Sequence, residues 1–317
     1  MALELSPPEI PSAHAVMGRA RGENFPVAAR VLSREHRRGL MAVYGFARMA
    51  DELGDELEGD RLAALDWLEG ELDRAYAGRA RHPLLGVLGE ALTEHPLPRE
   101  PFARLIEANR VDQRVTRYRT WEQLEDYCKL SANPVGELVL GVFDLATPER
   151  IALSDRVCTA LQLVEHLQDV ADDLARGRIY LPQEDLARFG CSHERLLRAG
   201  ADREPGLGAL APGARRRRRE EDLPPAGLRE TVVFEAERAR ELLAAGVALV
   251  AGVSGRAKLA VAAFVAGGDA AVEEIERARG EILAGVSRAG AWRRARALAR
   301  VLARGAGASA AIGWTSR

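Results

Sequence analysis

The stretch LQLVEHLQDVADDLARGRIYLP, residues 161–182, combines a helical repeat of apolar residues with a dense run of carboxylates. Apolar side chains recur in it at three- and four-residue steps, the spacing of one face of an α-helix. We expect this face to be buried, and its members are Leu161, Leu163, Val164, Leu167 and Val170. The interleaved carboxylates are Glu165, Asp169, Asp172 and Asp173. Because crowded, desolvated carboxylates are costly unless compensated, we expect a cation or hydrogen-bond donors beside them.

The same helical spacing recurs along nearly the whole chain of 317 residues, whereas the alternating runs typical of β-strands are scarce. Predicted helices cover residues 60–78, 99–117, 121–142, 148–177, 228–252, 269–286 and 289–304. Pro and Gly residues separate them, and Gly267-Gly268 stands directly before the helix expected to begin near Asp269. We therefore predict an all-α fold, and no linker divides it clearly into two domains.

Composition narrows the class of protein. The 45 basic and 47 acidic residues nearly cancel, so no bulk charge favours nucleic acid as the partner. Cys128, Cys158 and Cys191 lack CxxC pairing, which fits a reducing cytoplasm and argues against a disulfide framework or a zinc site. The N-terminus does not resemble a secretory signal, and no apolar run approaches the roughly 18 residues of a membrane span. The sequence predicts a protein that is soluble or at most peripheral to a membrane.

Residues 200–227 differ from the rest, because they combine Gly, Pro and the five-arginine run Arg215–Arg219 with little apolar content. No aromatic residue is interleaved for base stacking, so we expect a solvated loop rather than a nucleic-acid surface. Contact with anionic lipid headgroups is an alternative, since each basic charge near such a surface contributes about 1 kcal/mol.

Two pairs of aspartates share one spacing. Asp51 and Asp55 lie four residues apart, and Asp169 and Asp173 repeat this separation. Positions i and i+4 of an α-helix lie on one face, so each pair points in one direction. Mg²⁺ takes oxygen ligands and is usually bound by one or two carboxylates together with substrate phosphates. Two such pairs facing each other predict a site for Mg²⁺ and a diphosphate.

Each pair has neighbours suited to phosphate, since arginine matches phosphate oxygens in bidentate fashion and keeps its charge. These neighbours are Tyr44 and Arg48 for the first pair, and Gln162, Glu165, Arg178 and Tyr180 for the second. Taken singly, each acidic helix would more often be a solvated surface, and GRIYLP a loop that leaves a helix. The combination of both pairs with their arginines favours a functional site.

With these residues assembled, the chain resembles the squalene and phytoene synthase family, which implies a single-domain, all-α isoprenoid synthase fold with a central cavity. The resemblance covers about residues 13–290 of 1–317. Its most specific motifs are NFPVA (24–28), YGFARMADELGDE (44–56), YCKLSANPVG (127–136) and LQDVADDLARGRIYLPQEDLARFG (167–190). ENFPVA and SANPVG are similar to the bacterial branch of hopanoid gene clusters, the HpnC-type hydroxysqualene synthases.

That branch implies Mg²⁺-dependent conversion of presqualene diphosphate and water to hydroxysqualene. Matched by motif, Asp51, Asp55, Asp169 and Asp173 are the expected metal ligands and catalytic residues, and Tyr127 is a further expected catalytic residue. Diphosphate is expected at Tyr44, Arg48, Gln162, Arg178 and Tyr180. The motifs place Tyr127, Val135 and Gly136 in the reaction cavity, with Asn24 and Phe25 as further substrate contacts. Phe25, Tyr44, Tyr127 and Phe143 are candidates to face a carbocation.

The chain departs from the family pattern in three places. Glu52 stands where a second aspartate is usual, and Glu165 replaces an asparagine, which makes Glu165 either a further metal ligand or an obstacle to diphosphate. The stretches 200–227 and 277–287 match poorly. Two alternatives therefore stay open: head-to-head condensation of two prenyl diphosphates such as farnesyl diphosphate, and a non-catalytic helical partner of a pathway enzyme.

Overall fold

The fold is given by a computed structural model, which describes residues 10–18, 32–201, 226–278, 282–284 and 289–312. These residues form helices and turns, and they contain no β-strand beyond one isolated bridge between Arg117 and Ile179. The predicted all-α fold is confirmed. The chain divides into two compact units. Unit 1 is Met1–Arg114, Lys129–Asp155 and Gly255–Leu259, and unit 2 is Val115–Cys128, Arg156–Ser254 and Ala260–Arg317. The predicted domain limits of 1–317 and the central cavity stay predictions.

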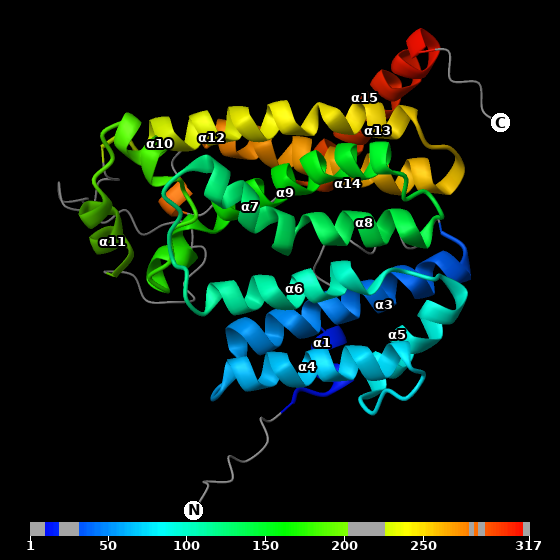
Figure 1. Cartoon of the computed structure of the whole chain (residues 1–317). Helices are drawn as coiled ribbons and strands as arrows, with labels where there is room; N and C mark the ends of the chain where they lie inside the picture. The colour runs from blue at the N-terminus through cyan, green and yellow to red at the C-terminus, as the bar shows by residue number, and fades with distance from the viewer. Residues whose placement is uncertain (1–9, 19–31, 202–225, 279–281, 285–288, 313–317) are drawn as a thin grey trace, which may run out of the picture. The chain divides into compact units, whose positions relative to one another are not determined.

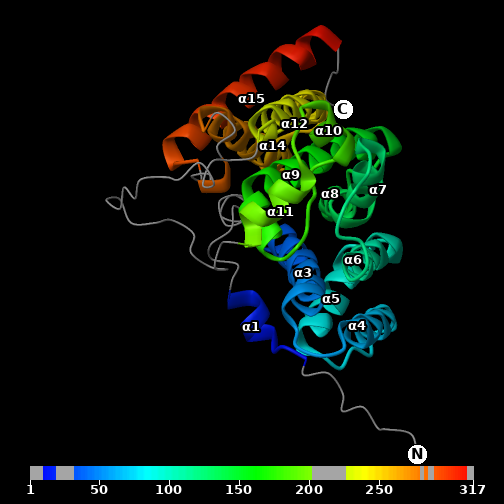
Figure 2. The same ribbon diagram turned by 90° about the vertical axis from the view of Figure 1, so that its left-hand side faces the viewer.

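Unit 1 is a bundle built around one helix, α3 (Figure 1). Its elements are α1 (Ala13–Gly18), α3 (Arg34–Asp51), the π-helix η2 (Glu52–Glu56), α4 (Arg61–Tyr76), α5 (Pro83–Glu94), α6 (Arg99–Asp112) and α8 (Asn133–Val142). Helix α3 contacts α1, α5, α6 and α8, and α4 packs on both α5 and α6 (Figure 2). The Ser33 hydroxyl accepts a hydrogen bond from the backbone N–H of His36 at 3.2 Å, which caps α3 at its start.

The core of unit 1 is formed by large side chains on α3 and its neighbours. Phe46 and Met49 of α3 have no exposed surface, and Phe46 meets Phe102 of α6 edge to face with ring centroids 4.9 Å apart. This packing fixes the end of α3, where Asp51 lies.

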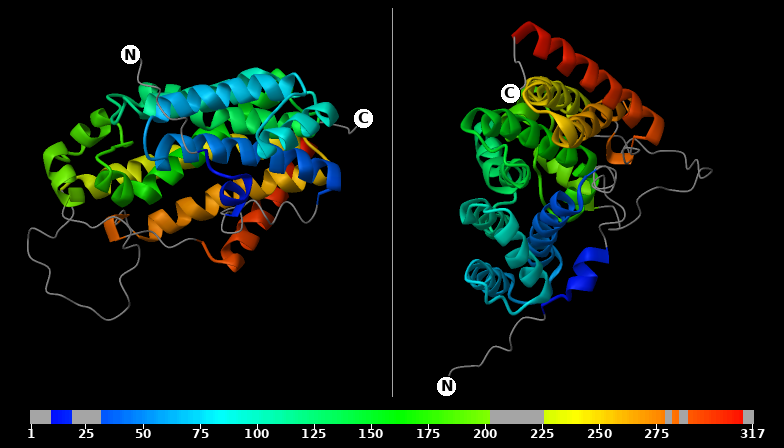
Figure 3. Two further views of the ribbon diagram at one scale, coloured as in Figure 1. Left: turned by 90° about the horizontal axis from the view of Figure 1, so that it is seen from below. Right: turned by 90° about the vertical axis from the view of Figure 1, so that its right-hand side faces the viewer.

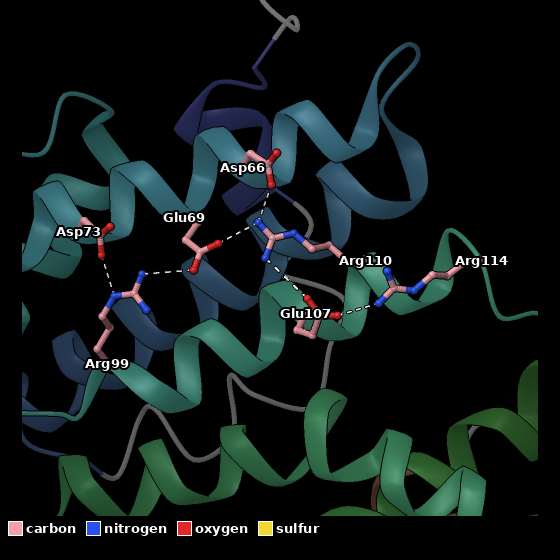
Figure 4. A network of polar contacts seen from close by, with 7 residues as sticks. All are labelled: Asp66, Glu69, Asp73, Arg99, Glu107, Arg110 and Arg114. Atoms are coloured by element: carbon pink, nitrogen blue, oxygen red, sulfur yellow. Dashed lines mark hydrogen bonds and ion pairs between the residues drawn. The ribbon is translucent and has the colours of Figure 1, made fainter.

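Ion pairs fasten α6 to α4 on the outside of unit 1 (Figure 4). Arg110 donates to Asp66 at 2.6 Å and to Glu69 at 2.8 Å, and Arg99 donates to Asp73 at 2.6 Å. Exposed pairs contribute only about 0.2–1 kcal/mol each, so the network orients α6 more than it stabilises the fold. It thereby holds the opposite face of α6 toward the end of α3.

Unit 2 contains the longest helices. Its elements are α7 (Trp121–Ser131), α9 (Pro148–Ala175), α10 (Gln183–Arg188), α11 (His193–Ala201), α12 (Leu228–Leu243), α13 (Ala245–Ala251), α14 (Gly255–Arg277), η4 (Ile282–Ala284) and α15 (Ala291–Ile312); α7, α9 and α14 each have residues in both units. Helix α15 packs on α13 (Figure 3). A Cβ at Gly305 of α15 would lie 2.8 Å from the Val250 side chain. None of the described helices is long and apolar enough to cross a membrane.

Several predicted helix boundaries were wrong, and the helix expected over 228–252 is divided at Ala244 into α12 and α13. The helix expected over 121–142 is interrupted at Ala132, because Pro134 in the first turn of α8 lacks a backbone N–H. The helix expected to begin near Asp269 begins at Gly255 instead and runs through Gly267 and Gly268. A Cβ at Gly268 would lie 2.8 Å from Leu161 and 2.9 Å from Leu243, so this glycine permits close helix packing rather than ending a helix. Asn24, Phe25 and the predicted loop residues 202–225 lie outside the described residues.

A buried ionic cluster joins α7, α10 and α12 in unit 2. Arg238 donates to Asp185 at 3.0 Å and to Glu235 at 2.6 Å. Its guanidinium also lies 4.5 Å from the centre of the Trp121 ring and 4.7 Å from that of Phe234. Burial raises the pKa of Glu235 to about 8; Arg238 opposes this shift and Asp185 adds to it.

This shift predicts a pH-dependent stability. Folded Glu235 binds a proton up to about pH 8, whereas the unfolded carboxyl loses it near 4.5, so the group destabilises the fold as pH rises through this window. Glu235→Gln removes the titration. As pH rises from 6 to 9, we expect the melting temperature of the variant to increase by about 2–4 °C relative to that of the wild type. Thermal unfolding followed by circular dichroism at several pH values measures the gap, and parallel curves would contradict the assignment.

Candidate functional site

The first aspartate pair lies where α3 passes into a π-helix. Asp51 is the last residue of α3 and Asp55 belongs to η2, where the N–H of Leu57 bonds the carbonyl of Glu52 at 3.0 Å. The expectation of a continuous α-helix through both residues was therefore wrong. Both residues are exposed, so a cation could reach them from solvent. Single π-turns inside helices are frequent at functional sites.

The π-turn is shaped by α6. A Cβ at Gly54 would lie 2.0 Å from the side-chain oxygen of Asn109, so only glycine leaves room for this amide. Asn109 is buried, and its Nδ2 donates to the Leu105 carbonyl at 3.1 Å and approaches the Asp51 carboxylate at 3.5 Å. Gln113 donates to the Gly54 carbonyl at 2.8 Å. Sequence reasoning missed Asn109 and Gln113, because no motif marks a residue that supports a turn on another helix.

The electrostatics of Asp51 suit a cation. Its carboxylate is reached by water, yet the surrounding protein desolvates it and raises its pKa to about 6. Arg48 and the Asn109 amide oppose this shift, while Asp55 and Asp112 add to it. A divalent cation would favour the ionised form of Asp51, which burial and the carboxylates of Asp55 and Asp112 disfavour.

Arg48 lies one turn before Asp51 on α3. Its Nη2 is 3.5 Å from a carboxylate oxygen of Glu52 and 3.5 Å from one of Glu56, which are long ion pairs. Its Nε is buried and has no hydrogen-bond partner among the described residues. The guanidinium thus keeps donor capacity for an anion, and Glu52 is placed to orient it. Tyr44 is half-buried one turn earlier.

The second aspartate pair lies on α9. Glu165 and Asp169 are exposed and Asp173 is half-buried, so the carboxylates follow the open face of the helix. The opposite face is buried, as predicted, for Leu163, Val164, Leu167 and Val170, whereas Leu161 is only half-buried. Among the described residues, no three His, Cys, Asp or Glu side chains form a metal site by themselves.

Gly177 turns the chain back at the end of α9. It adopts a φ of +74°, and the N–H groups of Gly177 and Arg178 bond the carbonyls of Leu174 at 3.0 Å and Asp173 at 2.8 Å. This pattern is a Schellman cap. Arg178, Asp173 and Tyr180 consequently line one small recess. The turn therefore brings the arginine of GRIYLP next to the second aspartate pair.

Aromatic side chains gather beside this recess in unit 2. The His166 and Tyr180 rings stack with centroids 4.0 Å apart and planes 6° apart. Tyr127 lies 5.9 Å from Tyr180, and Tyr118 lies 5.4 Å from Tyr127. Burial lowers the pKa of His166 to about 3, so the imidazole is neutral. Sequence reasoning missed His166 and Tyr118; the only signal was that His166 follows Gln162 by four residues on a helix.

The other predicted cavity residues lie in unit 1. Val135 is half-buried and Gly136 buried, both on α8. Phe143 is buried at the end of that helix and packs on His36, with ring centroids 4.8 Å apart. Their predicted roles stay predictions.

The sequence pattern of the squalene/phytoene synthases matches residues 19–296 of this chain. The chain belongs to the squalene/phytoene synthase family. Among solved structures, this family member is similar to squalene synthase HpnC from Alicyclobacillus acidocaldarius, with 40% identity, a TM-score of 0.71, and coverage of 84% of this chain and 92% of that one. A dehydrosqualene synthase structure has 21% identity and a TM-score of 0.72, and the match covers 92% of this chain and 94% of that one. At this identity, the likeness supports the fold alone.

The curated relatives of this family member include hydroxysqualene synthases and phytoene synthases. The hydroxysqualene synthase of Rhodopseudomonas palustris is 39% identical over 181 residues, which cover 56% of this chain and 60% of the relative. Phytoene synthase 1 of Solanum lycopersicum is 34% identical over 184 residues, which cover 55% of this chain and 44% of the relative. The chain therefore spans about half the length of the curated relatives it matches. The resemblance to the HpnC-type branch is confirmed.

Proposed function

We propose that this chain converts presqualene diphosphate and water to hydroxysqualene and diphosphate in a Mg²⁺-dependent reaction. The observation that carries the proposal is that each aspartate pair has an arginine nearby on its own unit. The first set is Asp51, Asp55 and Arg48, and the second is Asp169, Asp173 and Arg178. Likeness to hydroxysqualene synthases supports this choice of substrate.

The first step is cleavage of the C–O bond to the diphosphate. Mg²⁺ held by the aspartates would supply a Lewis acid for the leaving group. Arg48 and Arg178 donate hydrogen bonds to diphosphate oxygens and neutralise charge as the bond breaks. The buried Arg48 Nε fits this role, because binding an anion would satisfy it.

The second step is capture of the carbocation. Tyr127 and Tyr180 offer aromatic faces, which attract a cation through the ring quadrupole. The oxygen of one water bonds to the cationic carbon, and the proton released passes to the departing diphosphate. No protein acid or base is required.

Product analysis tests the proposal. The protein is incubated with Mg²⁺ and presqualene diphosphate, and separately with farnesyl diphosphate. We expect hydroxysqualene from the first substrate only. Consumption of farnesyl diphosphate instead would assign the chain to head-to-head condensation, which the similarity to phytoene synthases supports. Calorimetry with Mg²⁺ and diphosphate identifies a non-catalytic helical partner, since such a protein would bind neither.

Glu165 gives a separate prediction. Its carboxylate is exposed on α9, one turn before Asp169, where the family pattern has asparagine. Glu165→Asn lowers the negative charge beside the diphosphate and keeps an oxygen ligand, so we expect turnover to be preserved or raised. Steady-state kinetics at saturating Mg²⁺ measures the effect. Complete loss of activity would instead make Glu165 a required metal ligand.

A further inference from the structure

His166 connects three candidate site residues that come from different segments of unit 2. Its Nε2 lies 3.3 Å from the Nε2 of Gln162, one turn earlier on α9. Its ring stacks on Tyr180, which follows the turn at Gly177. The Tyr127 ring of α7 lies 6.3 Å from it, centroid to centroid.

The imidazole is held in one orientation. It is 7% exposed, and the near-parallel stack at 4.0 Å leaves its plane no room to turn. The Gln162 amide fixes the ring from the edge. Tyr118 also lies against Tyr180, with ring centroids 5.9 Å apart and planes 25° apart.

We propose that His166 is a positioning residue, which fixes Tyr180 and, through it, Tyr127 in the orientation that faces the reacting chain of the substrate. The inference rests on the function proposed above. Aromatic faces stabilise a cation only where they are already oriented, since reorienting them during the reaction consumes the gain. A flat ring at position 166 is therefore required, and a branched aliphatic side chain of similar volume would release Tyr180.

Two substitutions distinguish the role of the flat ring of His166 from the role of its nitrogen atoms. His166→Phe keeps a flat partner for Tyr180 and loses the contact with Gln162, whereas His166→Leu loses both. We expect His166→Phe to keep kcat within about threefold and His166→Leu to lower it about ten- to a hundredfold, because small misplacements of catalytic groups have effects of this size. The Mg²⁺ concentration for half-maximal rate should stay within twofold in both, since the aspartates are untouched. The fraction of product formed by water capture should fall in His166→Leu alone.

Phe234→Leu, which removes a ring from the Arg238 cluster on α12, controls for general loss of aromatic packing and should keep kcat. The inference is overturned if His166→Leu keeps kcat within twofold, or if His166→Phe is as impaired as His166→Leu. Should His166→Leu unfold, His166→Met, which also lacks a flat ring, tests the same orientation, and an unchanged product ratio there overturns it. Near-ultraviolet circular dichroism reports the tyrosine packing without substrate. An unchanged spectrum in His166→Leu refutes the positioning role even if the wild type proves inactive on presqualene diphosphate.

Discussion

Asp169→Asn should abolish Mg²⁺-dependent diphosphate release and leave the helical content intact. Asp169 is exposed on α9, so exchanging a carboxylate oxygen for an amide creates no cavity and no buried unsatisfied group. Substitutions of this kind usually change the free energy of unfolding by less than about 0.5 kcal/mol. The charge proposed to bind Mg²⁺ is lost, however, and with it the proposed stabilisation of the leaving diphosphate. We expect kcat/KM to fall at least about a hundredfold, the size of effect seen when one stabilising group is removed from a developing charge.

The measurement is release of diphosphate from presqualene diphosphate over a range of Mg²⁺ concentrations, with circular dichroism on the same samples. Glu241→Gln removes an exposed carboxylate from α12 and serves as the matched control, for which activity should be unchanged. Full activity of Asp169→Asn at ordinary Mg²⁺ would refute the proposed role of Asp169 as a metal ligand. Partial recovery at high Mg²⁺ would support it, because weaker binding can be offset by concentration.

The sequence was sufficient to predict the fold class, because helices follow from short-range spacing, and the same kind of spacing identified the residues proposed for the candidate site. Apolar steps of three and four residues gave the helices, and the repeated DxxxD spacing marked both aspartate pairs. The prediction of a helix start near Gly268 was wrong because tertiary packing determines the role of this glycine. Glycine ends helices locally, but here it accommodates Leu161 and Leu243 inside one.

His166 and Asn109 could not be identified from the sequence for the same reason, because their contacts are tertiary. In the sequence, His166 resembles an ordinary buried histidine. Only the folded chain shows that Tyr180, which follows the turn at Gly177, stacks on it. Asn109 lies on a different helix from Asp51, and only packing brings its amide to the π-turn. Residues that position others in this way carry no spacing signal, because their partners are distant in the chain.

Gly54→Ala should impair the first aspartate pair strongly. The added Cβ would lie 2.0 Å from Oδ1 and 2.7 Å from Cγ of Asn109, so one of the two helices must shift. Overpacking of this kind costs about 1–3 kcal/mol of unfolding free energy. Displacing Asn109 also removes the amide beside Asp51 and disturbs the turn that carries Asp55. We expect a higher Mg²⁺ requirement together with a fall in kcat of about tenfold or more.

Gly86→Ala on α5 is the matched control, since a Cβ there meets nothing within 4 Å and alanine favours the helix by about 1 kcal/mol. A double-mutant cycle identifies the cause of the damage. Asn109→Ala removes the two closest overlaps, so adding Gly54→Ala to it should change kcat and the Mg²⁺ midpoint much less than Gly54→Ala does in the wild type. Additive effects would mean that Gly54 acts through the backbone of the π-turn and not through Asn109. An unchanged Mg²⁺ midpoint in Gly54→Ala itself would show that the geometry of this turn does not govern how Asp51 and Asp55 bind the cation.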